Sequence, residues 1–177
     1  MDENDLINLA KKNPAKFKGI YEKYFKPIFL FVYRKTGDKE LTSDLVSQVF
    51  TIALSKLDKY EYRGLPFSAW LYRIADNEVA QYYRKTGKMR WVTIDDRMIE
   101  SMCEESKGPD PELIRKNLEQ IFRELNPIEV RLLELRFFED KSYKEVAFIT
   151  EMTETNAKTK VWRILEKIRL KINFNEE

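Results

Sequence analysis

The 177-residue chain contains no histidine and only one cysteine, Cys103. Without histidine, the Ser–His and Cys–His pairs that activate nucleophiles in many hydrolases are excluded. A lone thiol forms no internal disulfide, and without histidine it cannot complete a Cys/His zinc site. These two absences exclude several common enzyme classes and fit a reducing, cytoplasmic setting.

Glycine and long apolar runs are also scarce. The five glycines are scattered, so the sequence has no glycine-rich loop that could cradle phosphates. No apolar run is long enough to cross a membrane, and the N-terminal MDENDLINLAKKN lacks the apolar centre of a signal peptide. Carboxylates are plentiful, but no spacing marks a catalytic pair. We therefore expect a chain that is not an enzyme, needs no cofactor or metal and is not inserted in a membrane.

Hydrophobic side chains make up 43% of the chain and charged side chains 35%, which suits a water-soluble protein with modest cores. Apolar residues recur at helical spacing almost everywhere, and no stretch alternates as a half-buried strand would. The net charge is only +2, so the local distribution of charge is more informative than the total. The sequence predicts an all-α protein.

An acidic stretch interrupts the helical pattern. Residues 95–112, DDRMIESMCEESKGPDPE, hold seven carboxylates against Arg97 and Lys107, and prolines flank Asp110. This composition is typical of a flexible linker. We predict two small helical domains, residues 1–90 and 112–177, joined by an acidic linker over residues 91–111.

Three helices are expected in the first domain. Pro27 lies inside the first and should kink or split it, and Gly37 should end it in a left-handed conformation. On the second, Asp44 and Gln48 face outward while Leu45 and Val49 face inward. A polar helix face of this kind is usually only solvated, so its spacing alone indicates no function. Pro66 suits the first turn of the third helix.

The stretch YRGLPFSAWLYRIADN, residues 62–77, mixes aromatic rings with arginines and an asparagine. Rings stack on unpaired bases and cations follow the backbone, so the mixture favours single-stranded nucleic acid over duplex. The alternative is that Trp70 and several tyrosines are simply core residues. The candidate contacts are Tyr62, Arg63, Trp70, Arg73, Asp76, Asn77, Tyr83 and Arg84.

The second domain has the pattern of a helix-turn-helix. Asn126 can cap one helix, and Ser142 with Glu145 forms a capping box for the next. A short break then precedes a long basic helix that begins near Thr153, the layout of a recognition helix in a major groove. The alternative is a three-helix bundle with a solvated basic face. The candidate duplex contacts are Thr155, Asn156, Lys158, Thr159, Lys160 and Arg163.

Over roughly residues 15–88 and 112–172, the chain resembles a bacterial RNA polymerase sigma factor of the extracytoplasmic-function type. GDKELTSDLVSQVFTIAL is similar to the family's helix that docks on the polymerase clamp helices, which implies polymerase contacts from Asp44, Leu45, Gln48 and Phe50. PFSAWLYRIADN resembles its promoter-melting segment and NEVAQYYRK its reader of the minus-ten element. LNPIEVRLLELRFFEDKSYKEVAFI, with the basic helix, resembles its reader of the minus-thirty-five element.

The resemblance implies an alternative sigma factor that binds core RNA polymerase and promoter DNA and is held inactive by an anti-sigma factor. It also implies a linker that threads the channels of the polymerase. Glu151 and Thr155 stand where the family usually has glycines, so the turn and the promoter contacts depart from its pattern here. The rival interpretations are a stand-alone helix-turn-helix regulator and a helical decoy that reads no DNA. A redox role for Cys103 is a further, weaker alternative.

Overall fold

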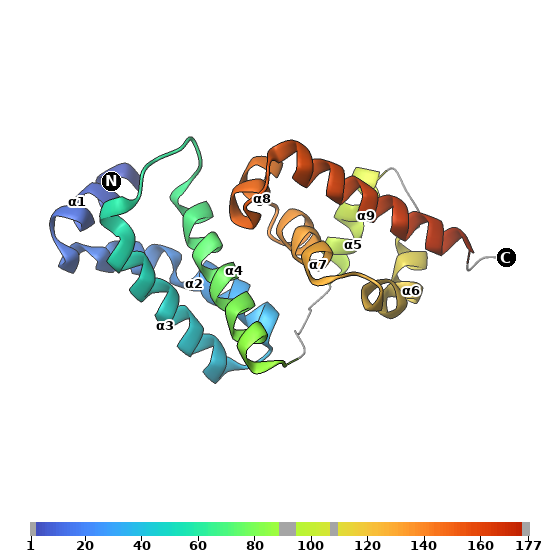
Figure 1. The fold of residues 1–177 in the computed structure, drawn as a ribbon, viewed down its shortest axis with the longest axis horizontal. Coiled ribbons are helices and arrows are strands. Elements are labelled where there is room, and N and C mark those ends of the chain that lie inside the picture. The colour runs from blue at the N-terminus through green and yellow to red at the C-terminus, as the bar shows by residue number, and fades with distance from the viewer. Residues whose placement is uncertain (1–2, 89–94, 107–109, 175–177) are drawn as a thin grey trace. The chain divides into compact units, whose positions relative to one another are not determined.

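The structure, a computed structural model, describes residues 3–88, 95–106 and 110–174 (Figure 1). All regular elements in these ranges are helical, which confirms the predicted all-α class. The chain divides into two compact units, residues 1–93 and 94–177. None of the described helices is long and apolar enough to span a membrane.

Within residues 3–88, the first unit holds four helices and two short 3-10 turns. The helices are α1 (Glu3–Lys12), α2 (Phe17–Thr36), α3 (Lys39–Lys56) and α4 (Phe67–Thr86), and the turns are η1 (Pro14–Lys16) and η2 (Leu57–Lys59). The helices α2, α3 and α4 pack against one another, and their apolar stripes form the core. Its most deeply buried side chains include Ile28, Phe31, Val32, Val49, Phe67 and Leu71.

Helix α2 runs through Pro27 as one element, where the sequence predicted a kink or a split. The predicted left-handed glycine is confirmed: Gly37 has φ 65°, and its N–H donates to the carbonyl of Tyr33 at 2.8 Å. Asp38 then caps α3 by accepting from the N–H of Leu41 at 3.0 Å. The sharp corner between α2 and α3 therefore follows from the sequence TGD.

Glu3 fastens α1 to two other helices. Its carboxylate accepts from the Tyr24 hydroxyl, from Lys23 Nζ at 3.1 Å and from the backbone N–H of Phe67 at 3.2 Å. Burial opposes the charged form of Glu3, but these hydrogen bonds outweigh it and lower its pKa. Burial, with the bond to Glu3, raises the pKa of Tyr24 to about 12.

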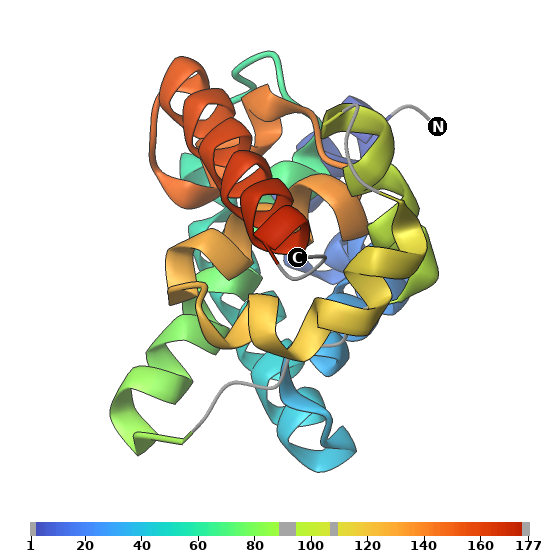
Figure 2. The ribbon, with the colours of Figure 1, turned by 90° about the vertical axis from the view of Figure 1, so that its right-hand side faces the viewer.

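In the described part of the second unit, residues 95–106 and 110–174, there are five helices and one π-helical turn. They are α5 (Asp96–Ser106), α6 (Pro111–Arg123), α7 (Pro127–Leu133), the turn η3 (Glu134–Phe138), α8 (Tyr143–Thr150) and α9 (Glu154–Phe174). The long α9 contacts α5, α6, α7 and α8 (Figure 2). Its inward residues Ala157, Val161 and Ile168 are buried.

Helix α5 lies where the acidic linker was predicted. Met98, Ile99 and Met102 are buried, and α5 packs against η3, α6 and α9. Three apolar residues at helical spacing are enough to hold this helix, while its carboxylates point outward or meet arginines. Residues 91–94 and 107–109 of the predicted linker lie outside the described residues.

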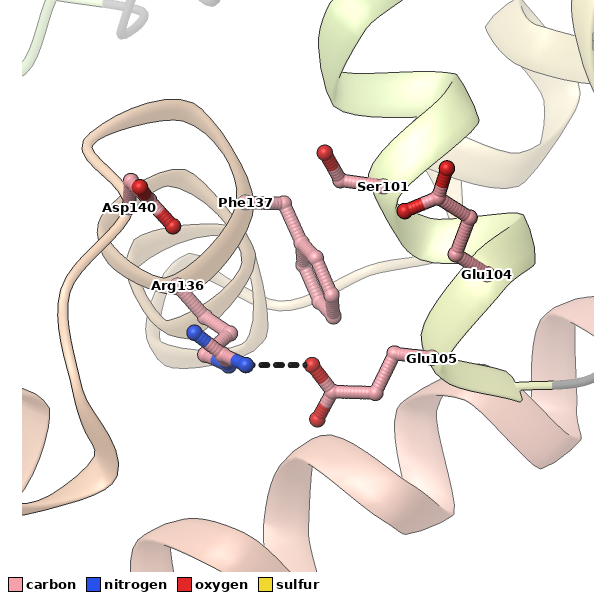
Figure 3. Close-up of a pocket in the computed structure, with 6 residues that line it drawn as sticks. All are labelled: Ser101, Glu104, Glu105, Arg136, Phe137 and Asp140. Atoms are coloured by element: carbon pink, nitrogen blue, oxygen red, sulfur yellow. Dashed lines mark ion pairs between the residues drawn. The ribbon is translucent and has the colours of Figure 1, made fainter.

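Arg136 joins α5 to the helix-turn-helix (Figure 3). Its guanidinium lies 2.8 Å from Glu105 of α5 and 4.9 Å from the ring centre of Tyr143, which begins α8. The Tyr143 hydroxyl also donates to Glu105, and burial together with that bond raises the pKa of Tyr143 to about 12. Arg136 and Glu105 border a pocket of about 410 Å³ that Ser101, Glu104, Phe137 and Asp140 also line.

The predicted helix starts in this unit are confirmed. Asn126 with Glu129, and Ser142 with Glu145, form complete capping boxes at α7 and α8. The Thr153 hydroxyl accepts from the N–H of Asn156 at 3.2 Å, as expected for the cap of α9. Glu151 ends α8 in a left-handed conformation with φ 59° and ψ 41°. The turn therefore keeps the backbone shape that glycine usually supplies, in spite of the side chain.

Candidate nucleic-acid and polymerase interfaces

One face of α4 presents polar groups to solvent. Asn77 and Arg84 are exposed and Arg73 is half-buried, and they lie on one side of the helix because they are separated by four and seven residues. In the loop before α4, Tyr62 is 66% exposed, and the Arg63 guanidinium lies 3.8 Å from Glu61. Five of the predicted strand contacts thus lie at the surface of one helix and its leading loop.

Trp70 belongs partly to the core and partly to this surface. Its ring packs against Tyr60 and Phe67, with ring centres 5.1 and 5.3 Å away, yet it remains half-exposed. The core interpretation therefore describes one side of this ring, and the stacking interpretation stays a prediction for its exposed side. A ring held on one side by other rings is a rigid platform for a base on the other.

Asp76 requires a correction, because the structure does not place it on the exposed face. Its side chain is buried, and a carboxylate oxygen lies 3.7 Å from the ammonium of Lys35. Neighbouring residues on a helix point about 100° apart, so Asn77 can face solvent while Asp76 faces α2. Tyr83 is half-buried, and its hydroxyl donates to the carbonyl of Lys35 at 2.7 Å.

The α3 residues divide in the same way. Asp44 and Gln48 are exposed and line a pocket of about 310 Å³ between α3 and α4. Its other lining residues are Leu41, Leu45, Glu78, Gln81, Tyr82 and Lys85. Leu45 also lines the pocket but is buried, as its predicted inward position requires, so the polymerase contact that the resemblance implies for it stays a prediction.

Phe50, for which the resemblance implies a polymerase contact, does not reach the surface of α3. It is buried, and its ring packs edge-on against Tyr21 at 4.8 Å between centres and Phe17 at 6.4 Å. Phe50 falls on the inward side of α3 because it lies one turn after the buried Val46 and one turn before the buried Ala53. It therefore supports the α3 surface from below.

The predicted duplex contacts gather on α9. Thr155, Asn156, Lys158, Thr159 and Arg163 are exposed, and Lys160 is half-buried. Sequence reasoning missed Trp162, which is 61% exposed and lies one turn after Lys158 and Thr159. The sequence did indicate that Trp162 is exposed, because it directly follows the inward Val161 and a residue next to an inward one points to the side or outward.

Comparisons with known proteins assign both units. The family models described as sigma-70 region 2 and sigma-70 region 4 match residues 20–89 and 115–168. The α4 face and the α3 pocket lie within the first match, and the exposed face of α9 lies within the second.

Relatives of the whole chain agree. It is 27% identical to the ECF RNA polymerase sigma factor BldN of Streptomyces coelicolor, over 93% of this chain and 63% of BldN, so it spans less than two thirds of that relative. It is 30% identical to the RNA polymerase sigma factor SigV of Bacillus subtilis, over 80% of this chain and 81% of SigV. CnrH, solved in complex with the cytosolic domain of CnrY, has the same fold, with a TM-score of 0.61 and 16% identity over 95% of each chain. The chain therefore belongs to the extracytoplasmic-function group of the sigma-70 family of RNA polymerase sigma factors.

Proposed function

We propose that this sigma factor docks on core RNA polymerase through α3, holds the opened minus-ten strand on α4 and reads the minus-thirty-five duplex with α9. The observation that carries the proposal is the exposed face of α4, where Asn77 and Arg84 lie on the same helix as the half-exposed Trp70. A protein that read only duplex DNA would have no use for a ring platform beside an amide and guanidinium groups.

The polymerase contact is assigned to the polar rim of the α3 pocket. Asp44 and Gln48 offer a carboxylate and an amide beside the partly exposed side chains of Leu41 and Tyr82. A partner helix can place apolar side chains against Leu41 and Tyr82 and polar ones at the rim, the usual arrangement of a small interface.

The upstream contact is assigned to the first turns of α9. Lys158 and Arg163 can reach phosphates, while Thr155 and Asn156 can reach base edges. Trp162 adds an apolar surface that suits the methyl group of thymine. The left-handed turn at Glu151 sets the direction in which α9 leaves α8.

The proposal includes a protein partner that holds the chain inactive. CnrH, which shares the fold, was solved with the cytosolic domain of another protein. The family resemblance implies an anti-sigma factor in this role. The proposal also has the chain act in the cytoplasm, where core polymerase and the chromosome are found.

The first experiment mixes the purified chain with bacterial core RNA polymerase and passes the mixture over a sizing column. We expect co-elution at one to one, followed by run-off transcription from a promoter that the holoenzyme selects from a randomised duplex pool. Failure to co-elute with a polymerase that accepts another sigma factor, combined with duplex binding by the chain alone, would favour a stand-alone regulator.

A matched pair of variants tests the α3 assignment. Asp44→Lys reverses a charge at the pocket rim and should weaken core binding at least tenfold, since like-charge contacts cost several kcal/mol at interfaces. Asp58→Lys makes the same change at an exposed position on η2 and should leave core binding unchanged. Equal behaviour of the two variants would remove α3 from the proposed interface.

A further inference from the structure

Lys35 and Asp76 form a charged pair in the interior of the first unit. Each residue is 1% exposed, and the ammonium lies 3.7 Å from a carboxylate oxygen. Lys35 belongs to the last turns of α2, and Asp76 to the middle of α4. The ammonium also lies 4.5 Å from the ring centre of Phe31.

Stability alone does not explain such a pair. Removing two charges from water costs about as much as their attraction returns, and well-packed apolar residues of similar volume are often equally stable or more so. An ion pair differs from an apolar contact in being selective, because a buried charge is strongly disfavoured unless its partner of opposite charge lies beside it. Its contribution is therefore to geometry.

A second contact holds the same residue. Tyr83 stands two helical turns after Asp76 on the same side of α4, and its hydroxyl donates to the backbone carbonyl of Lys35 at 2.7 Å. The side chain and the backbone of Lys35 are thus both held by α4, at points about 10 Å apart along that helix. The ion pair and the hydrogen bond lie on one side of α4, so both oppose rotation of α4 about its own axis.

The rotation of α4 decides what its outward face presents. Asn77 directly follows Asp76, so a turn of the helix that moved Asp76 away from α2 would move Asn77 out of its exposed position. Arg73 and Arg84 share the face of Asn77 and would move with it.

We propose that Lys35, Asp76 and the Tyr83 hydroxyl are positioning groups that fix the rotation of α4, so that Asn77 and its neighbours meet the unpaired promoter strand. This inference rests on the proposed function of α4. It assigns no contact with DNA to the buried pair itself, and it predicts that the pair acts through Asn77.

The test compares two double variants in the holoenzyme. Lys35→Met with Asp76→Leu replaces the buried pair with apolar side chains. Lys18→Met with Glu22→Leu makes the same change at an exposed pair on α2, whose charged atoms lie 3.6 Å apart. Strand opening is measured by permanganate reactivity of unpaired thymines in a promoter selected by the wild-type holoenzyme, and core binding by co-elution.

We expect the buried double variant to bind core polymerase normally and to open the promoter on the order of tenfold less well, the effect of one lost hydrogen bond. The exposed control should open it normally. In an Asn77→Ala background, the buried double variant should cause little additional loss, because both changes remove the same contact. Normal opening by the buried double variant, or full additivity with Asn77→Ala, overturns the inference.

Tyr83→Phe keeps the test decisive if the buried double variant does not fold. It removes only the hydroxyl that donates to Lys35, keeps the ring, and should reduce opening a few-fold in the same non-additive way with Asn77→Ala. Unchanged opening would contradict the inference. Failure of the wild-type holoenzyme to open any promoter would instead refute the proposed function, and this inference with it.

Discussion

Asn77 and Asp76 are adjacent in the chain but lie in opposite environments, one in solvent and the other in the interior. A side chain amide at the surface can donate and accept in the plane of a base, whereas a buried carboxylate beside an ammonium is already engaged. At this scale, function depends on the direction in which each side chain leaves the helix.

Replacing Asn77 with alanine should reduce promoter opening about tenfold, the value of one hydrogen bond to a base. Core binding should stay normal, because Asn77 lies outside the α3 pocket. Permanganate footprinting and co-elution measure the two effects separately. An equal loss of core binding would show that Asn77 supports the fold and does not contact the strand.

Replacing Trp162 with alanine should cost little stability, within about 0.5 kcal/mol, because the side chain is 61% exposed. It should weaken discrimination between the selected upstream element and a scrambled one by about 1–3 kcal/mol. Filter binding with the two duplexes measures this difference. Leu170→Ala, at another exposed position of α9, is the control and should leave discrimination intact.

Helical spacing indicated which face of each helix is apolar. It did not indicate which charged residues form ion pairs in the interior. Asp76 was therefore predicted as a surface contact, since nothing in the sequence shows that Lys35 approaches it from another helix. Leu45 and Phe50 came from the family resemblance, which identifies a docking helix and does not separate its exposed residues from the buried ones that support them.

At the scale of the helices, the turn between α8 and α9 contains a residue that pays a steric cost. A left-handed conformation at Glu151 is unfavourable for a side chain with a Cβ atom. Glu151→Gly should raise the free energy of unfolding of the second unit by about 1 kcal/mol. Thermal and urea unfolding measure the change. Glu154→Gly, inside the first turn of α9, should lower that free energy instead.

Glu3 makes the attachment of α1 depend on pH. Its pKa is lower in the folded state, so the stability it contributes is present above its ordinary pKa and is lost as pH falls through the folded value. Glu3→Gln should cost about 1–2 kcal/mol at pH 7 and flatten the fall in stability below about pH 4.5. Urea unfolding at several pH values checks this. An acid profile unchanged from wild type would contradict the assignment.

The sequence predicted helix ends correctly where a residue type with a specific capping role stands at the end. Asn126, Ser142 and Gly37 each act at the helix end that the sequence indicated. Helix α5 was not predicted, because its acidic composition concealed three apolar residues whose burial requires α6, η3 and α9. Whether such a helix forms depends on its packing against distant segments, which local composition does not show.

For the whole molecule, a net charge of +2 gives little long-range attraction to DNA. The salt dependence of promoter binding should therefore reflect local contacts. Lys158→Ala or Arg163→Ala should each lower the slope of log affinity against log salt by about 0.9. Lys116→Ala, at an exposed position of α6, is the control and should leave the slope unchanged. An unchanged slope for both α9 variants would rule out phosphate contacts there.

The only cysteine in the sequence, Cys103, lies on α5, so the reactivity of its thiol reports on the packing of this helix. Burial raises the pKa of Cys103, aided by the carboxylates of Asp110 and Glu100 and opposed by Arg115. The thiolate that reacts with a maleimide is therefore scarce while α5 stays packed. Cys103 is partly exposed, so it reacts slowly in the packed helix, and we expect its labelling rate to rise when α5 unpacks. A change in that rate when polymerase is added would reveal whether this helix keeps its packing during initiation.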